Sequence, residues 1–226
     1  MAYQFLKDQG APMLVSRVSI ADGKVAEAAN AKVTGLKATA EGLEFDCAEQ
    51  ALPWIIEPSA KEALGLVPVE AELNQEQFAA SLPAGNYKLL IDGQEVGQYS
   101  AEALKAGINL ASNDKTPQYK QALQVFQVNE NRSNIEVKLR TYAQMRSVFV
   151  NAKLNEDDDA AVQAWFDAWL KKLGDSYTAY FTNQLKVYRD TRTQLEPIKQ
   201  QIETLQQQLW QLNQPKAHRW QLVKVA

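Results

Sequence analysis

The chain has 226 residues, of which 46% are hydrophobic and 23% are charged, and its net charge is −3. This mild acidity argues against nucleic-acid binding, which needs clustered lysine and arginine. Because the chain holds one cysteine, Cys47, and one histidine, His218, it excludes an intramolecular disulfide and any metal site built from several cysteines or histidines.

Glycine and proline are concentrated in the first half of the chain. Nine of the ten glycines lie at or before Gly107, and six of the eight prolines lie at or before Pro117. Turn residues at this density are typical of short strands, whereas long spans without them favour helices. The sequence therefore predicts an α+β protein with a β-rich N-terminal half of short antiparallel strands.

The first half alternates between apolar runs and turn signals such as Asp22-Gly23 and Asp92-Gly93. The predicted elements are a short helix at 1–9, strands at 13–20, 33–39 and 43–47, a helical turn or two at 60–64, strands at 76–82, 87–91 and 95–99, and a short helix at 101–105. Ser100 is the expected N-cap of this last helix and Gly107 its C-terminal stop.

The second half carries helical spacing. Pro117 marks a helix start, and apolar residues then recur at three and four residues up to Phe149. Further helices are predicted at 160–172 and 176–213, with Pro197 forcing a kink or restart. The stripe from Leu195 to Leu212 favours an antiparallel helical hairpin or short coiled coil. Residues 218–225 alternate like a strand and are predicted to return to a sheet. No apolar run is long enough to predict a membrane span, and the first residues lack a signal-peptide pattern.

Gly174-Asp175-Ser176 spells the nucleophile motif of GDSL-type esterases. That chemistry needs the serine on a turn after a buried strand, with an oxyanion hole and a histidine base in reach. The residues before Gly174 have helical spacing instead, and the residue three before His218 is Pro215. We therefore reject Ser176 as a nucleophile and expect Gly174 to end one helix and Asp175 and Ser176 to cap the next.

The other chemically suggestive residues have structural explanations. His218 is expected to be a half-exposed strand residue, and Cys47 a small buried apolar side chain. The run Glu156–Asp159 lacks the alternating ligands and central glycine of a calcium loop, so we expect a solvated helix cap. Trp165, Phe166 and Trp169 fit a core face better than a ligand platform. The sequence thus predicts no catalytic, cofactor-binding or metal-binding residue and no cofactor.

Several stretches together resemble one family. Residues 1–12, "MAYQFLKDQGAP", are similar to the segment after the catalytic histidine in bacterial SGNH/GDSL hydrolase family proteins. Residues 82–111, "LPAGNYKLLIDGQEVGQYSAEALKAGINLA", and 116–122, "TPQYKQA", resemble the C-terminal extension of the same proteins, as do 65–68, "GLVP", and the closing "HRWQLVKV". Asn109 in "GINLA" lacks the catalytic setting of the family's oxyanion-hole asparagine.

The resemblance implies a particular domain organisation and function. Residues 1–12 would be the remnant helix of a hydrolase domain, 13–112 a β-rich module, and 113–226 an α-helical hairpin module with a C-terminal strand. The chain would be a truncated or mis-started product, a non-catalytic accessory or interaction module whose partner is a catalytic domain missing upstream of residue 1. The full-length relatives look exported, while the localisation of this chain stays open.

Two alternatives remain open. The first is an SGNH-type hydrolase, an esterase or acylhydrolase, active only with the missing domain or through Ser176. The second is a structural adaptor that self-associates through the helical hairpin at 176–213. Activity on esters would favour the first alternative, and concentration-dependent association would favour the second.

Overall fold

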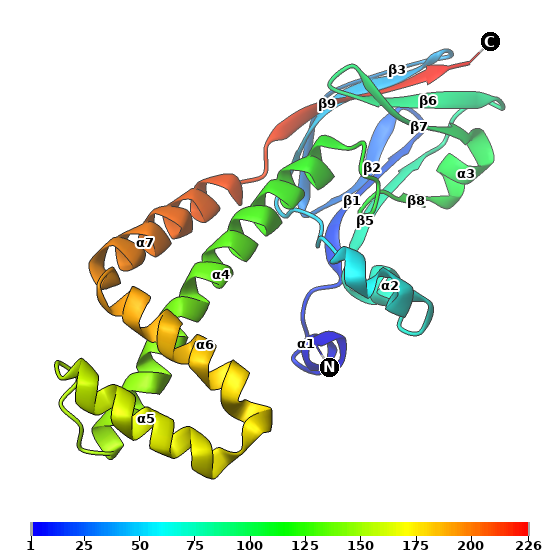
Figure 1. Ribbon diagram of the computed structural model, residues 1–226. Helices are drawn as coiled ribbons and strands as arrows, with labels where there is room; N and C mark the ends of the chain where they lie inside the picture. Colours follow the sequence, from blue (N-terminus) through cyan, green and yellow to red (C-terminus); the bar gives the residue numbers. More distant parts are fainter. Residues whose placement is uncertain (1, 226) are drawn as a thin grey trace. The chain divides into compact units, whose positions relative to one another are not determined.

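The structure is a computed structural model that describes residues 2–225. The chain divides into two compact units, which we call unit 1 (residues 1–126 with 210–226) and unit 2 (residues 127–209). Strands dominate the first half, long helices follow, and a strand ends the fold, as Figure 1 shows. The predicted α+β class is therefore confirmed. The predicted division at residues 12 and 112 stays a prediction.

Unit 1 contains two sheets. The first has the strand order β2-β1-β5-β8, with β1 (Leu14–Ala21), β2 (Lys24–Ala29), β5 (Gln75–Ala80) and β8 (Ile108–Asn109). β1 pairs with β2 and β5 with β8 in antiparallel fashion, whereas β1 and β5 are parallel. The parallel pair departs from the predicted antiparallel pattern, because the connection between β1 and β5 passes through two strands of the other sheet.

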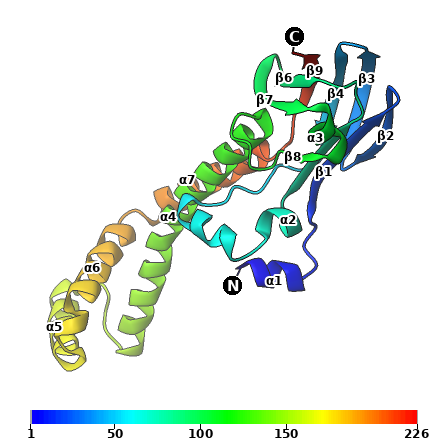
Figure 2. The same ribbon diagram turned by 90° about the vertical axis from the view of Figure 1, so that its right-hand side faces the viewer.

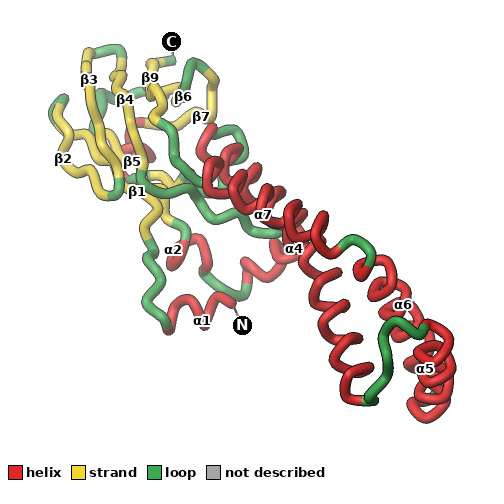
Figure 3. Tube along the Cα trace, turned by 90° about the vertical axis from the view of Figure 1, so that its left-hand side faces the viewer, coloured by secondary structure: helices red, strands yellow, loops and turns green. Residues whose placement is uncertain are grey.

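The second sheet has the order β3-β4-β9-β6-β7 and is antiparallel throughout. Its strands are β3 (Ala31–Thr39), β4 (Gly42–Glu49), β6 (Asn86–Ile91), β7 (Gln94–Ser100) and β9 (Ala217–Lys224). The predicted return of the last segment to a sheet is confirmed, and β9 occupies the central position, as the strands drawn in yellow in Figure 3 show.

The two sheets share one apolar core. Alternate residues of β4 and β9 are buried, which is the expected pattern for strands with one face against a core. Phe45 of β4, Phe78 of β5 and Trp220 of β9 meet with ring centroids 5.2 to 6.0 Å apart. Aromatic side chains bury large areas and therefore contribute strongly to the stability of this core.

Short helices complete unit 1. They are α1 (Ala2–Asp8), the 3₁₀ helix η1 (Pro58–Gly65), α2 (Val69–Leu73) and α3 (Ala101–Ala106). The Ser100 side chain accepts a hydrogen bond of 3.2 Å from the backbone N–H of Ala103, and Gly107 ends α3 with a φ of 91°. Both predicted caps of this helix are confirmed.

The long helices are α4 (Pro117–Asn151), α5 (Asp159–Leu173), α6 (Asp175–Arg192) and α7 (Leu195–Leu212). Within unit 2, α5 and α6 pack side by side (Figure 2). The unit has its own core, composed of Met145, Phe149, Val162, Phe166, Leu170, Leu185 and Tyr188. None of the helices described in residues 2–225 is long and apolar enough to cross a membrane.

The structure departs from the predicted elements in several places, including α2 and β8, which were not predicted. The structure adds β2, whose sequence "KVAEAA" lacks the alternation of a half-buried strand because nearly all of its residues are exposed. The helix predicted over 176–213 is two helices that separate near Thr193, before Pro197. Pro197 lies in the first turn of α7, where a missing N–H leaves no intrahelical hydrogen bond unmade.

Candidate functional site

Asp92 and His218 form the most distinctive polar pair of unit 1. Asp92 lies in the two-residue turn between β6 and β7, with a φ of 51°, and His218 lies near the start of β9. The Asp92 Oδ2 atom is 2.7 Å from Nδ1 of His218, and Oδ1 accepts a 2.8 Å hydrogen bond from the backbone N–H of Arg219. The backbone N–H of Asp92 donates in return to the carbonyl of Arg219 at 2.8 Å.

The sheet explains how these residues meet. β6 and β9 are neighbours, and their register places Ile91 opposite Trp220, so the turn after Ile91 reaches His218. His218 shares the buried face of β9 with Trp220 and Leu222 and is 9% exposed. The prediction of a half-exposed histidine is therefore wrong. Local sequence patterns do not predict the contact between Asp92 and His218, because 126 residues separate them in the chain.

Two opposing effects set the pKa of Asp92. Burial raises the pKa of Asp92, but the hydrogen bonds from His218 and from the Arg219 backbone outweigh it and lower the pKa overall. Asp92 is therefore an ionised acceptor that holds the imidazole in one orientation. In the neutral ring, Nδ1–H donates to Asp92 and Nε2 keeps its lone pair.

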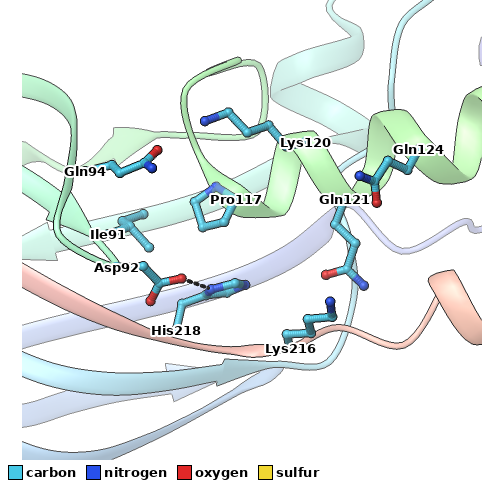
Figure 4. Close-up of a pocket in the computed structure, with 9 residues that line it drawn as sticks. All are labelled: Ile91, Asp92, Gln94, Pro117, Lys120, Gln121, Gln124, Lys216 and His218. Atoms are coloured by element: carbon cyan, nitrogen blue, oxygen red, sulfur yellow. Dashed lines mark hydrogen bonds and ion pairs between the residues drawn. The ribbon is translucent and has the colours of Figure 1, made fainter.

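A pocket of about 340 Å³ opens beside this pair, and Figure 4 shows its lining side chains. They are Ile91, Asp92, Gln94, Pro117, Lys120, Gln121, Gln124, Lys216 and His218. The volume is at the lower end of the range for small-molecule sites. The lysines and glutamines come from α4, from the start of β7 and from the residue before β9. They supply cationic and amide groups that suit a ligand with carbonyl or anionic oxygens.

Gln121 is fixed in the wall of this pocket. Its side-chain NH₂ donates to the carbonyls of Leu212 and Gln214, at 2.7 and 2.6 Å. Because a carbonyl oxygen can only accept a hydrogen bond, the side-chain atom of Gln121 that faces both carbonyls must be the nitrogen. Its Oε1 therefore points away from them. Among the described residues, neither Gln121 Oε1 nor His218 Nε2 has a hydrogen-bond partner, although both are buried. Buried polar atoms of this kind usually bind water or a ligand.

A second set of polar side chains is buried in unit 1. Glu49 of β4 is 6% exposed and accepts hydrogen bonds from Ser16 Oγ at 2.5 Å and from Gln118 Nε2 at 2.6 Å. Glu76 of β5 pairs with Ser16 in the register of β1 and β5 and is 1% exposed. Neither carboxyl oxygen of Glu76 has a partner among the described residues. We call Ser16, Glu49, Glu76 and Gln118 the interior cluster.

Burial controls the protonation of the interior cluster. It raises the pKa of Glu76 well above the ordinary value, and the nearby charge of Glu49 raises it further. Burial also raises the pKa of Glu49, and this pKa stays raised although the hydrogen bonds from Ser16 and Gln118 and the charge of His218 oppose the shift. Glu49 is therefore the better site for the negative charge, and Glu76 for the proton.

Cys47 does not supply a nucleophile. It lies opposite His218 in the pairing of β4 and β9 and is completely buried. Burial, together with the charges of Glu49 and Glu76, raises the pKa of its thiol to about 12. The thiolate is the reactive form, so this cysteine is an inert core residue, in line with the expectation of a buried apolar side chain.

The other residues considered from sequence have structural partners. The Asp158 side chain accepts from the N–H of Ala161 at 2.9 Å and caps α5, as predicted, while Glu156 pairs with Arg146 and with the Tyr188 hydroxyl. Asn109 Oδ1 accepts from the backbone N–H groups of Glu76 and Ala111, which is a structural role.

The remaining candidates lie in unit 2. Gly174 ends α5 with a φ of 89°, as predicted, and Ser176 lies exposed in the first turn of α6. The prediction that Asp175 and Ser176 cap this helix is wrong, because Gly174 is its N-cap and no side chain caps it. Phe166 is buried, and Trp165 and Trp169 pack against the core of the unit. No group of three or more His, Cys, Asp and Glu side chains in residues 2–225 is arranged to hold a metal ion. That Ser176 has no catalytic role stays a prediction, as does self-association through 176–213.

Comparisons with known proteins give one informative match. No family model matches the chain, and no curated protein matches it. A solved structure described as BT4096, a gut microbial diltiazem-metabolizing enzyme, matches with 29% sequence identity and a TM-score of 0.87. The match covers 100% of this chain and 53% of that one, so the chain spans about half the length of that structure.

This match corrects the interpretation based on resemblance. The chain is similar over its whole length, residues 1–12 included, to the structure of an enzyme. The assignment as a C-terminal extension of SGNH/GDSL hydrolases is therefore wrong. The match is to part of an enzyme structure, and it gives no support to the interpretation as a non-catalytic module.

Proposed function

We propose that this protein is an enzyme that hydrolyses small organic molecules, with Asp92 and His218 as its acid–base pair. The observation that carries the proposal is the 2.7 Å contact of Asp92 with His218 at the wall of the 340 Å³ pocket, which leaves Nε2 without a partner among the described residues. The similarity to a diltiazem-metabolizing enzyme supports the choice of a small organic substrate.

The proposed chemistry is attack by water. Nε2 of His218 accepts a proton from a water molecule while the water oxygen bonds to an ester carbonyl carbon. Asp92 stabilises the resulting imidazolium through Nδ1–H. Lys120 and Lys216 line the pocket and balance the negative charge that develops on the carbonyl oxygen. The imidazolium then returns the proton to the leaving alcohol as the ester C–O bond breaks, which gives a carboxylic acid and an alcohol.

Water reaches Nε2 through movement of the pocket lining. Nε2 has no exposed surface in the structure, but Lys120, Gln124 and Lys216 are exposed side chains. Rotamer changes of exposed side chains take picoseconds to nanoseconds and therefore do not limit turnover. Contacts of catalytic groups are often completed only when the substrate binds.

Incubation with diltiazem and with a series of nitrophenyl esters, followed by mass spectrometry of the products, tests the proposal. We expect conversion by the purified chain and at least a ~100-fold loss of rate in His218→Gln and Asp92→Asn. Asp22→Asn is a matched control, because Asp22 lies in the Asp-Gly turn between β1 and β2 with the same φ of 51°. Absence of conversion by the wild-type chain, or full activity of His218→Gln, contradicts the proposal.

A further inference from the structure

Glu49 is a second carboxyl group beside His218. Cys47 lies opposite His218 in the pairing of β4 and β9, and Glu49 follows two residues later on the same buried face. Side chains on one face of neighbouring strands interact at this diagonal spacing. The strand register therefore places the Glu49 side chain diagonally beside that of His218.

The interior cluster holds Glu49 in place. Its carboxyl oxygens accept from Ser16 and Gln118, which come from β1 and α4. A buried carboxylate with two short hydrogen bonds has little freedom to rotate away or to bind water. The position of its charge is therefore set by three separate elements of unit 1.

Glu76 explains why the charge stays on Glu49. The two buried carboxyl groups interact, and like charges in a low-dielectric interior do not both ionise. Glu49 has two donors, whereas Glu76 has no partner among the described residues. The pair therefore keeps one proton, which resides on Glu76.

We propose that Glu49 is a positioning residue for His218, whose buried charge stabilises the protonated imidazole from inside the sheets while Asp92 does so from the β6–β7 turn. The proposal rests on the acid–base role of His218 proposed above. The other titratable groups around His218 are Cys47 of β4, which stays neutral, Lys216 before β9 and Lys120 of α4, which both line the pocket. The positive charges of the two lysines disfavour protonation of His218, and the negative charge of Glu49 offsets this effect.

The single histidine makes a direct test possible. His218 gives the only imidazole signals in the nuclear magnetic resonance spectrum of the chain, so its titration can be followed without assignment ambiguity. We expect Glu49→Gln to move the midpoint of this titration to lower pH by about half a unit or more, because one attractive charge is lost. The pH–rate profile of ester hydrolysis is expected to shift in the same direction.

Glu49→Gln is expected to fold. The glutamine keeps the shape of the side chain, and its Oε1 still accepts from Ser16. Gln118 Oε1 has no partner among the described residues, so a flip of the Gln118 amide offers an acceptor to the new NH₂ group. Ser16→Ala is a second variant, which removes one donor to Glu49 and is expected to move the midpoint in the same direction by a smaller amount.

Glu44→Gln is the matched control. Glu44 also lies on β4, but it pairs with Arg219, and its register partner on β9 is Gln221. We expect this variant to leave the His218 midpoint within about 0.2 unit of wild type, because the Glu44 charge is half-exposed, screened by solvent and balanced by Arg219. An unchanged midpoint in both Glu49→Gln and Ser16→Ala overturns the proposal. The titration needs no turnover, so an inactive protein with a shifted midpoint contradicts only the proposed function.

Discussion

Cys47 combines complete burial with two carboxyl groups nearby, and both features disfavour its thiolate. We predict that the native protein reacts with iodoacetamide at least about 100-fold more slowly than a free thiol at pH 8, because both access and ionisation are suppressed. Mass spectrometry of the alkylated protein measures the rate. Protein unfolded in guanidinium is the control and should react fully, and rapid labelling of the folded chain would contradict the thiol environment described here.

Glu76 is predicted to make stability depend on pH. Its pKa in the folded chain is raised above the value of 4.5 for a free side chain, so the unfolded chain loses this proton first as pH rises. The contribution of Glu76 to stability is therefore complete below about pH 4.5 and declines from there to the folded-state pKa. Glu76→Gln keeps a neutral group at every pH, and its melting temperature should exceed that of wild type by several degrees at pH 8.

The same comparison at pH 4 is the internal control for Glu76→Gln, since wild type and variant then carry the same charge and should differ little. Glu57→Gln, at an exposed position, controls for the general effect of removing a carboxylate. Thermal unfolding followed by circular dichroism at both pH values measures the difference. A variant that is less stable than wild type at pH 8 and equally stable at pH 4 would show that Glu76 is ionised and paired.

At the scale of elements, Gly42 has the least room for a side chain among the glycines of the chain. It begins β4 with a φ of 147°, and a Cβ atom there would lie 1.9 Å from the backbone oxygen of Leu222 in β9. We predict that Gly42→Ala lowers the free energy of unfolding by about 3 kcal/mol or more, because backbone must move in the centre of a sheet. Urea denaturation measures the loss.

Gly65→Ala is the control for this substitution. Gly65 ends η1, and a Cβ atom there would meet nothing within 4 Å. We expect a change within about 0.5 kcal/mol, as for other surface substitutions. Equal stability of both variants would show that β4 and β9 tolerate a wider separation than the structure has.

The elements that could be predicted from sequence are those with a strong local pattern. β1, β4, β6 and β9 alternate, and α5 carries Val162, Phe166 and Leu170 at helical spacing. β2 was missed because it is an exposed strand that pairs only with β1, and its alanine and glutamate residues have low strand propensity. Its existence depends on the Asp22-Gly23 turn, which places it beside β1, rather than on its own composition.

At the scale of the whole molecule, local sequence patterns could not predict which residues of the candidate site contact one another. Asp92 was identified as a turn residue and His218 as a strand residue, and both assignments hold. Their contact depends on the insertion of β9 between β4 and β6, which is a property of the sheet order. Glu49 and Glu76 likewise meet only because two sheets share one core. The site is thus a consequence of topology, and periodicity carries no information about it.

The two units have separate cores, which predicts separate responses to a core substitution. Phe149 is completely buried in unit 2, with its ring 5.1 Å from that of Tyr188 and 6.1 Å from that of Trp165. Phe149→Ala should destabilise unit 2 by roughly 3–5 kcal/mol, because a large cavity replaces the ring. Val150→Ala, at the neighbouring position, which is 54% exposed, should change stability by less than about 0.5 kcal/mol.

Two probes distinguish the units in this experiment. Circular dichroism at 222 nm follows mainly the helices, whereas the nuclear magnetic resonance signal of His218 reports on unit 1 alone. In Phe149→Ala we expect the helical signal to fall at a lower temperature than in wild type, while the His218 signal keeps its wild-type transition. If both signals shift together to the lower temperature, the chain unfolds as one cooperative system, and the separate cores do not act as separate folding units.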